Sequence, residues 1–216
     1  MSSSMQQHHP PPLVVVMGVS GSGKTTVGAA LAQRLRVPFA DADDFHPEAN
    51  IDKMSAGIPL TDEDRGPWLD TIGAWLADHP DRGGVASCSA LRRAYRDVLT
   101  AAAPQAYFIH LHGTPQVIAA RVAGRPGHFM PAALVESQFA TLEPLEADER
   151  GAVLDVDQPV DDLVTQSLDL LRHGSAGART APGNPDPTGP TAPTDPSNPS
   201  NPSDPSDPSD PEATHP

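Results

Sequence analysis

The sequence predicts an α/β domain of three layers, in which a parallel five-stranded sheet is flanked by helices on both faces. Five short apolar stretches alternate with helical stretches between residues 13 and 173. The first apolar stretch leads directly into a glycine-rich loop, as in folds that bind phosphate at a strand-to-helix turn. The helical stretch between the second and third strands is longer than one crossover requires, and we expect it to contain a substrate-cap insertion.

The first half of the domain shows these elements most clearly. Residues 13–17 (LVVVM) form a continuous apolar run that suits a buried parallel strand. The helix expected over 25–36 places Val27, Leu31 and Leu35 on one face. A second strand is expected within 37–43 and a short helix within 46–57. A longer helix within 61–80 directs five apolar residues inward, namely Trp68, Leu69, Ile72, Trp75 and Leu76.

The second half repeats the alternation with weaker signals. The Thr114–Pro115 pair is a helix-start signature, because proline at the first helical position has no donor to lose. Residues 125–130 (RPGHFM) form a glycine and proline break that suits a hinge. The expected elements are strands within 84–90, 106–113 and 152–157, and helices within 91–102, 114–124, 131–143 and 160–172.

Both ends of the chain differ in composition from the middle. Residues 174–216 carry a proline every two or three positions and no large apolar residue, so they cannot form a core. We predict a disordered tail over 174–216, a disordered N-terminus over 1–12, and one folded domain over 13–173.

The net charge is −14, of which the tail supplies −5 through six acidic residues and one arginine. The remaining −9 belongs to the rest of the chain and offers no electrostatic surface for nucleic acid or an anionic membrane. The single cysteine, Cys88, cannot form an intramolecular disulfide, and no apolar run is long enough to span a bilayer. We therefore expect a cytoplasmic protein without nucleic-acid or membrane partners.

The loop after the first strand fits the phosphate-binding pattern G-x-x-x-x-G-K-[ST] at every fixed position. Glycines let the backbone N–H groups approach phosphate oxygens, and the following helix turns its positive end toward the anion. Lys24 is expected to reach the β and γ phosphates of ATP, and the Thr25 hydroxyl to bind Mg²⁺. The alternative is a glycine-rich turn with an incidental lysine. The predicted ATP-binding residues here are Gly18, Val19, Ser20, Gly21, Ser22, Gly23, Lys24, Thr25 and Thr26.

The segment FADADDFHP follows the second strand, at the sheet edge where ligands gather in parallel α/β folds. If the strand continues, Asp41 and Asp43 point to the same face. One carboxylate can hold Mg²⁺ through water, which we assign to Asp41. The other can accept a proton from an attacking hydroxyl, which we assign to Asp43 as general base. The alternative is a solvated strand end with acidic turn residues.

Six segments together resemble the gluconokinases, the small P-loop kinases of D-gluconate. They are MGVSGSGKTT, DADDFHPEANIDKMSAGIPLTDEDRGPWL, CSALRRAYRD, RPGHFM, SQFATLEP and DVDQP, and the resemblance as a whole runs over about residues 13–171. The resemblance implies an adenylate-kinase-like P-loop kinase fold, ATP-dependent phosphorylation of the 6-hydroxyl of D-gluconate, and a homodimer. The phosphate loop is shared by many protein families, whereas the aspartate-rich second segment is shared by far fewer.

A sugar acid needs a cation for its carboxylate and hydrogen-bonding groups for its hydroxyls. His46, Lys53 and Arg65 lie in the insertion, where a capped substrate would sit. Arg65 is the strongest candidate for the carboxylate, because its planar fork can bind it bidentately. Arg65 could instead pair with Asp62 or Asp64, His46 could cap the next helix, and Lys53 could be a surface lysine.

The segment SCSALRR follows the third strand. Ser87 and Ser89 can present hydroxyls at the strand end, and Arg92 or Arg93 can reach over the cleft to the substrate. The gluconokinases usually carry lysine where this chain has Arg92, so its contact is open. Tyr95 and Arg96 continue the motif, and helix packing with a surface charge explains them equally well.

Arg121 and Arg125 are four residues apart, hence on one helix face, just before the expected hinge. In small kinases such a lid excludes water and brings arginine to the transferring group. We assign Arg125 to the transition state, Arg121 to ATP, and His128 to the substrate. Ordinary surface roles remain the alternative for each. The segment 155–159 is expected to line the adenine.

Two other functions fit the same loop. One is a kinase of another small metabolite, such as shikimate or a different sugar acid, from which the segment between Asp41 and Leu69 separates this chain. The other is a P-loop ATPase switch that phosphorylates nothing. A switch would need an acid at the end of a strand to position water and magnesium, and the third strand ends VASCS without one.

Overall fold

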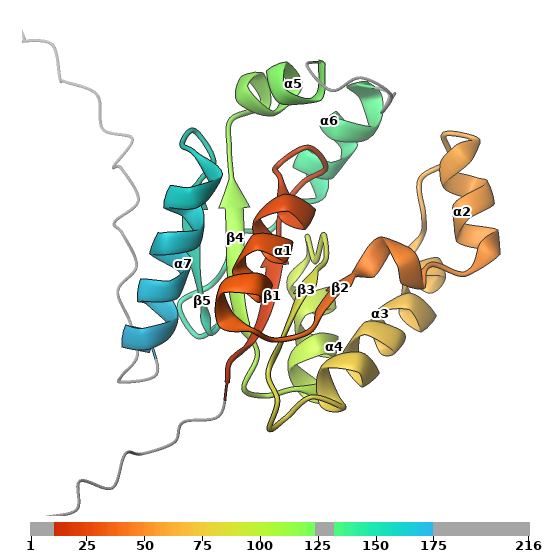
Figure 1. Ribbon diagram of the computed structural model, residues 1–216. Coiled ribbons are helices and arrows are strands. Elements are labelled where there is room, and N and C mark those ends of the chain that lie inside the picture. The colour runs from red at the N-terminus through yellow and green to blue at the C-terminus, as the bar shows by residue number, and fades with distance from the viewer. Residues whose placement is uncertain (1–10, 124–131, 175–216) are drawn as a thin grey trace, which may run out of the picture. The chain divides into compact units, whose positions relative to one another are not determined.

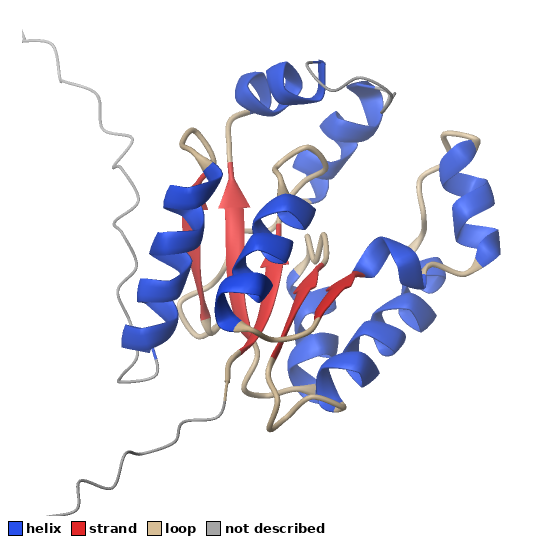
Figure 2. Cartoon of the chain, in the orientation of Figure 1, coloured by secondary structure: helices blue, strands red, loops and turns tan. Residues whose placement is uncertain are grey.

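The computed structural model describes residues 11–123 and 132–174. These residues contain one parallel sheet with the strand order β2-β3-β1-β4-β5, covered by helices on both faces (Figures 1 and 2). The predicted fold class is therefore confirmed. The hinge over 125–130 and nearly all of both predicted tails lie outside the described residues. The strands are β1 (Leu13–Met17), β2 (Phe39–Asp41), β3 (Gly84–Ser87), β4 (Tyr107–His112) and β5 (Gly151–Asp155).

Helices connect the strands in the predicted order, with ends within a few residues of the expected ones. A short 3₁₀ helix, Ala42–Phe45, follows β2. The α-helices are α1 (Lys24–Leu35), α2 (Glu48–Ser55), α3 (Asp62–Ala77), α4 (Arg93–Ala102), α5 (Pro115–Ala123), α6 (Ala132–Thr141) and α7 (Val160–Gly174). None of the helices in the described ranges is both long and apolar enough to cross a bilayer.

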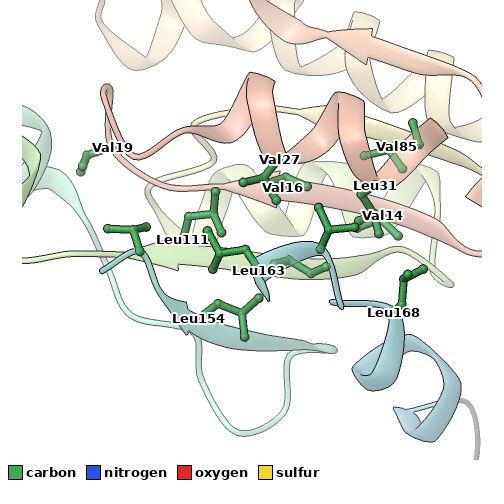
Figure 3. Packing of buried hydrophobic residues seen from close by; sticks show 14 of the residues in the cluster. Val14, Val16, Val19, Val27, Leu31, Val85, Leu111, Leu154, Leu163 and Leu168 are labelled. Carbon is green, nitrogen blue, oxygen red and sulfur yellow. The ribbon is translucent and has the colours of Figure 1, made fainter. Parts of the chain in front are cut away.

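The central strand β1 explains why the first apolar run has no polar gap. Its alternate residues enter two different cores. Val14 and Val16 pack with α1 and α7, in the cluster drawn in Figure 3. Val15 and Met17 point to the opposite face and pack with α3 and α4. Both faces of β1 are thus buried, and the loop that follows it is held between two packed layers.

The long helix α3 begins with a capping box. The Thr61 hydroxyl accepts a hydrogen bond from the Asp64 N–H, and the Asp64 carboxylate accepts one from the Thr61 N–H. Four of the five residues predicted to face inward are buried, while Trp75 is only partly buried against the same core. The capping box fixes where the helix begins, and so places Asp62 and Arg65 at the carboxyl edge of the sheet.

The predicted insertion between β2 and β3 consists of the 3₁₀ helix, α2 and the first turn of α3. Helix α2 is largely exposed and stands apart from the sheet (Figure 1). It is anchored to the start of α3 by Asn50, whose side chain donates to the Asp64 carbonyl at 2.9 Å, and by Lys53, which pairs with the Asp64 carboxylate. Helix α2 is therefore held to the domain mainly by polar contacts, whereas the 3₁₀ helix is anchored by buried Ala42 and by Phe45, which packs against the core.

Candidate active site

The glycine-rich loop joins β1 to α1 at the carboxyl edge of the sheet. Gly21 has a φ of 84°, and a Cβ there would lie 2.5 Å from Cγ2 of Val122 on α5. A side chain at this position would therefore displace α5 from the loop. Gly23 also has a left-handed φ, 97°, and stands at the N-cap of α1, with Thr25 and Thr26 in the first turn. The loop thus curls around the positive end of a helix, as phosphate binding requires.

The Lys24 ammonium group folds back over the loop and donates to the Val19 carbonyl at 3.1 Å. Val19 itself is buried in the core, so the far side of the loop is fixed. The first loop residue, Gly18, donates its N–H to the Ser89 carbonyl at 3.3 Å. Ser89 and the loop are therefore in direct contact through the backbone.

The structure brings together the two residues predicted to hold magnesium. The Thr25 hydroxyl donates to Asp41 Oδ2 at 2.8 Å. The other carboxylate oxygen of Asp41 accepts from the Asp43 N–H at 3.2 Å, which caps the 3₁₀ helix. The expected strand alternation of Asp41 and Asp43 is wrong, because β2 ends at Asp41 and Asp43 lies in the following turn. Asp43 is exposed and is joined through its N–H to Asp41, the residue that contacts Thr25.

The donors at this point fit magnesium. Magnesium prefers oxygen ligands, keeps several waters, and takes few ligands from the protein when it binds with phosphate. Thr25 and Asp41 supply such oxygens, and the described residues contain no group of three or more His, Cys, Asp or Glu that could hold a metal alone. The Ser22 and Ser87 hydroxyls are buried without a hydrogen-bond partner, and Ser87 is paired with Asp41 in the sheet. Unpaired polar atoms beside a carboxylate suit a hydrated ion.

His46 follows the 3₁₀ helix and lies flat on the indole of Trp68, with ring centroids 4.4 Å apart. The Trp68 indole N–H donates to the Ala42 carbonyl at 2.6 Å, which ties this stack to the aspartate-bearing turn. Burial lowers the pKa of His46, the charge of Arg65 lowers it further, and the charge of Asp43 opposes both. His46 is therefore neutral near pH 7, with one nitrogen that donates and one that accepts.

Lys53 on α2 is engaged with a carboxylate. Its ammonium group lies 2.7 and 2.8 Å from the two carboxylate oxygens of Asp64. The hydrogen bond from Lys53 is the main reason that the pKa of Asp64 lies below its usual value. Lys53 thus holds the insertion to α3, and a substrate would have to displace Asp64 to reach it.

Arg65 does not form the ion pair with Asp62 or Asp64 that its sequence position allows. Its guanidinium donates to the carbonyls of Leu60 and Thr61 and lies over the Tyr95 ring, 5.6 Å from the centroid. Arg65 lines a cleft of about 320 Å³. The cleft is formed by the start of α3, the segment before α4, and α6; its lining residues are Pro59, Leu60, Thr61, Asp62, Arg65, Leu91, Arg92, Ser137, Gln138 and Thr141.

Arg92, rather than Arg93, is the arginine of the SCSALRR segment that lines this cleft. Arg92 pairs with Asp62 at 2.6 Å, and the Tyr95 hydroxyl donates to the other oxygen of Asp62 at 2.5 Å. The Tyr95 hydrogen bond is the largest cause of the lowered pKa of Asp62, and the charge of Arg92 adds to it. The wall of the cleft therefore carries two arginines and one carboxylate.

Arg93 instead binds three carboxylates, those of Asp97, Glu146 and Asp148, at 2.8 to 2.9 Å. These contacts raise its pKa above the usual arginine value. Arg96 is not a surface charge but is fully buried. It pairs with Glu149 and donates to four backbone carbonyls, those of Ala90, Leu91, Glu143 and Pro144.

On the opposite side of the loop, Arg121 reaches two predicted ATP-binding segments. Its guanidinium donates to the Val156 carbonyl, in the segment expected at the adenine. The same group lies 3.9 Å from the position of a Cβ at Gly23 in the phosphate loop. Arg125 and His128 fall outside the described residues.

Gln138 is a contact that the sequence did not reveal. The Ser20 N–H in the phosphate loop donates to Gln138 Oε1 at 2.6 Å. Asp62 lines the cleft and Tyr95 donates a hydrogen bond to Asp62, but neither was predicted as a site residue. In the sequence, Tyr95 is recognisable only as part of a motif. Gln138 lies 118 positions from Ser20, so no spacing rule connects these two residues.

Comparisons with known proteins agree with this geometry. Residues 20–165 match the family model of shikimate kinase. The thermosensitive gluconokinase of Escherichia coli K12 is 45% identical over 154 residues, which cover 70% of this chain and 82% of that protein. The gluconokinase of Gluconobacter oxydans is 44% identical over 163 residues, covering 74% of this chain and 90% of that protein.

Solved structures extend the similarity to the fold. A gluconokinase from Sinorhizobium meliloti 1021 superposes with a TM-score of 0.72 at 48% identity, covering 77% of this chain and 95% of that one. A sugar kinase from Janibacter also gives a TM-score of 0.72, at 49% identity, covering 79% of this chain and all of that one. On this identity and coverage, the chain belongs to the gluconokinase family and shares the P-loop kinase fold that the shikimate kinase model describes.

Proposed function

We propose that this protein transfers the γ-phosphoryl group of ATP to the 6-hydroxyl of D-gluconate, giving 6-phospho-D-gluconate. The contact between Thr25 and Asp41 carries the proposal, because it places an aspartate-bearing turn directly at the phosphate loop. Membership in the gluconokinase family supports the choice of acceptor. Acceptor and triphosphate would then meet at the carboxyl edge of the sheet.

The donor half of the site positions and neutralises the triphosphate. The loop amides and Lys24 hold the phosphates, and Arg121 binds the nucleotide between the loop and Val156. Thr25 and Asp41 would hold Mg²⁺, Thr25 directly and Asp41 through water. When bound, the metal neutralises charge on the β and γ phosphates. Arg125 is proposed to reach the transferring group, although its position lies outside the described residues.

The acceptor half supplies a base and a carboxylate site. Asp43 is proposed to accept the proton of the 6-hydroxyl as it attacks, with neutral His46 as a partner for a neighbouring hydroxyl. Arg65 and Arg92 both line the cleft, and we assign the substrate carboxylate to Arg65 with support from Arg92. Ser89 remains a proposed hydroxyl contact, and His128 a proposed contact beyond the described ranges.

Lys53 and Arg93 are less suited to bind substrate than Arg65. Neither is among the residues that line the cleft, and both already contact carboxylates below 3 Å. We propose that Lys53 acts by holding the insertion over the cleft. Arg93 is proposed to fix the start of α4, so that Arg92 stays at the cleft wall.

A coupled ADP-release assay across D-gluconate, other sugar acids and shikimate tests the proposal. We expect ADP release that depends on D-gluconate, together with formation of 6-phosphogluconate. A preference for another acid would keep the kinase and change its substrate. Equal ADP release with and without any acceptor would instead support the ATPase switch.

Further proposals concern the setting of the enzyme. The resemblance to gluconokinases supports a homodimer, which light scattering of the purified protein would test. A cytoplasmic location is proposed because the single cysteine, Cys88, is a buried free thiol and disulfides are rare in that compartment. The proposed boundaries are a kinase domain over 13–173, an N-terminal segment over 1–12, and a tail over 174–216 whose sequence contains no large apolar residue.

A further inference from the structure

One side chain touches both halves of the proposed site. Gln138 on α6 accepts the Ser20 N–H of the phosphate loop with its carboxamide oxygen, at 2.6 Å. The same residue lines the cleft that also contains Arg65 and Arg92. Gln138 therefore lies between the phosphate loop and the cleft proposed for the acceptor.

The far end of α6 is fixed to the other wall of the cleft. The Glu143 N–H donates to the Leu91 carbonyl at 2.8 Å, and the Glu143 carboxylate accepts from the Arg93 N–H at 2.5 Å. The second contact satisfies one of the free donors at the start of α4. Leu91 and Arg92 line the cleft between these two anchors. A shift of the cleft wall would therefore be transmitted to α6, and through Gln138 to the loop.

The chemistry of a carboxamide suits this position. Its oxygen only accepts and its nitrogen carries two donors, so one side chain can serve a backbone N–H and an oxygen-rich ligand together. The contact with Ser20 restricts the three rotatable bonds of the Gln138 side chain, which costs side-chain entropy. A ligand in the cleft that accepts from the Gln138 NH₂ group would stabilise this conformer, so that the nucleotide meets a loop that is already held.

We propose that Gln138 is a positioning residue that couples the two substrates. Its oxygen holds the Ser20 amide and thereby the curvature of the phosphate loop. Its NH₂ group donates to an acceptor hydroxyl or carboxylate oxygen in the cleft. Occupation of the cleft then increases the affinity of the loop for nucleotide, and the reverse holds by linkage. The inference rests on the proposed function, because it takes the cleft as the acceptor site.

The test is calorimetric titration of the full-length protein with the magnesium complex of a non-hydrolysable ATP analogue, with and without saturating D-gluconate. The readout is the ratio of the two dissociation constants. For the unmodified protein we expect gluconate to tighten nucleotide binding about fivefold or more, within the usual range of coupling between sites. For Gln138→Met, which keeps the length and loses both hydrogen bonds, we expect a ratio near one.

Two further variants separate the roles. Gln138→Glu keeps an oxygen for Ser20 but has no NH₂ group, so its ratio should also fall to about one. Using a ratio cancels the effect of its added charge on nucleotide affinity. Glu136→Gln, an exposed neighbour on α6, is the matched control and should keep the original ratio. Thermal unfolding of each variant confirms that it is folded, and Gln138→Glu carries the test should Gln138→Met fail to fold.

Each outcome bears on the proposal. A ratio in folded Gln138→Met or Gln138→Glu that equals that of the unmodified protein overturns the coupling role. Normal turnover of D-gluconate by the unmodified protein with a ratio of one overturns the inference and leaves the proposed function standing. No turnover of D-gluconate overturns the proposed function, and the inference falls with it.

Discussion

Thr25 in the first turn of α1 donates its hydroxyl to Asp41 at the end of β2, across 2.8 Å and 16 positions of sequence. The contact joins the phosphate loop to the turn that carries Asp43. Because the two side chains are in hydrogen-bond contact, Thr25 would hold a magnesium ion directly and Asp41 would hold it through a water. The donor and acceptor halves of the site are thus fixed to each other before either substrate binds.

Asp41→Asn should therefore weaken magnesium-dependent nucleotide binding. We expect the affinity for the magnesium complex of ADP to fall roughly 10- to 100-fold, as when other outer-shell ligands of metals are replaced. Binding of ADP in EDTA should change little, since the carboxylate acts through the metal. Titration calorimetry in both buffers measures this, with Asp44→Asn in the same turn as control. Equal losses with and without magnesium would show that Asp41 does not act through the ion.

Asp43→Asn should abolish transfer while ATP still binds. An asparagine cannot accept the proton of the attacking hydroxyl, and removal of a general base costs about 10²- to 10⁴-fold in rate. The turnover number with D-gluconate and the dissociation constant of the ATP analogue are the two measurements. If the variant retains turnover, Asp43 is not the general base. The 3₁₀ turn would then contribute to the site only through Asp41.

Arg65→Lys should raise KM for D-gluconate more than Lys53→Met does. Lysine keeps the charge and loses the planar fork, so a bidentate contact is lost. A charged hydrogen bond contributes about 1.5–3 kcal/mol, which corresponds to a rise of roughly 10- to 150-fold. Steady-state kinetics with Arg34→Lys on the exposed face of α1 as control measure the difference. A larger effect at Lys53 would assign the carboxylate to the insertion instead.

The stability of the domain should depend on pH through His110 on β4. His110 is only 4% exposed, and burial, with smaller effects of His112 and Arg96, lowers its pKa to about 4. The unfolded chain, with a pKa near 6.5, binds more protons between these values. The free energy of unfolding therefore falls as pH drops from about 6.5 toward 4, by about 3 kcal/mol from this residue alone.

The measurement is urea unfolding at several pH values, for the unmodified protein and for His110→Gln. Other groups titrate in the same window, so the informative quantity is the difference between the two curves. As pH falls from 6.5 to 4, the free energy of unfolding of the unmodified protein should decrease relative to that of His110→Gln. Parallel curves would show that His110 is protonated alike in the folded and unfolded chain.

Deletion of residues 175–216 should leave catalysis and thermal stability nearly unchanged. The segment contains no large apolar residue, so it has little to bury against the domain. We expect kcat/KM within about twofold and Tm within about 2 °C of the full chain, since a larger shift would mean lost contacts of a kcal/mol or so. Calorimetric scanning and the coupled assay decide, and a marked loss in either would show that the tail docks.

Much of the fold follows from local pattern. The apolar run at 13–17 is buried on both faces, and Val27 and Leu31 enter one core as the helical period predicts. The phosphate loop is recognisable because its glycines meet a steric need, which the approach of Val122 to Gly21 illustrates. Such features depend on residues close in sequence or on one backbone requirement. They are therefore visible without the tertiary structure.

The partners of the charged residues were not predictable in the same way. Asp62 and Asp64 are the near neighbours of Arg65, yet Asp62 binds Arg92 and Asp64 binds Lys53. These pairs are set by where α2 and α4 pack against the start of α3. The strand alternation failed at Asp43 because Asp41 caps a turn with its own side chain, which ends the strand. Local hydrogen bonds of aspartate compete with strand geometry.

Buried Arg96 has a consequence for how the enzyme can move. Its guanidinium joins α4 to Glu149, to the Ala90 carbonyl before the helix, and to the Glu143 carbonyl after α6. If α4 moved relative to these partners, buried Arg96 would lose its hydrogen bonds without gaining water. We therefore expect α4 to stay fixed in the domain. Helix α2, exposed and tethered by a few polar groups, has no comparable anchor. We therefore expect that any movement of the domain on binding is larger at α2 than at α4.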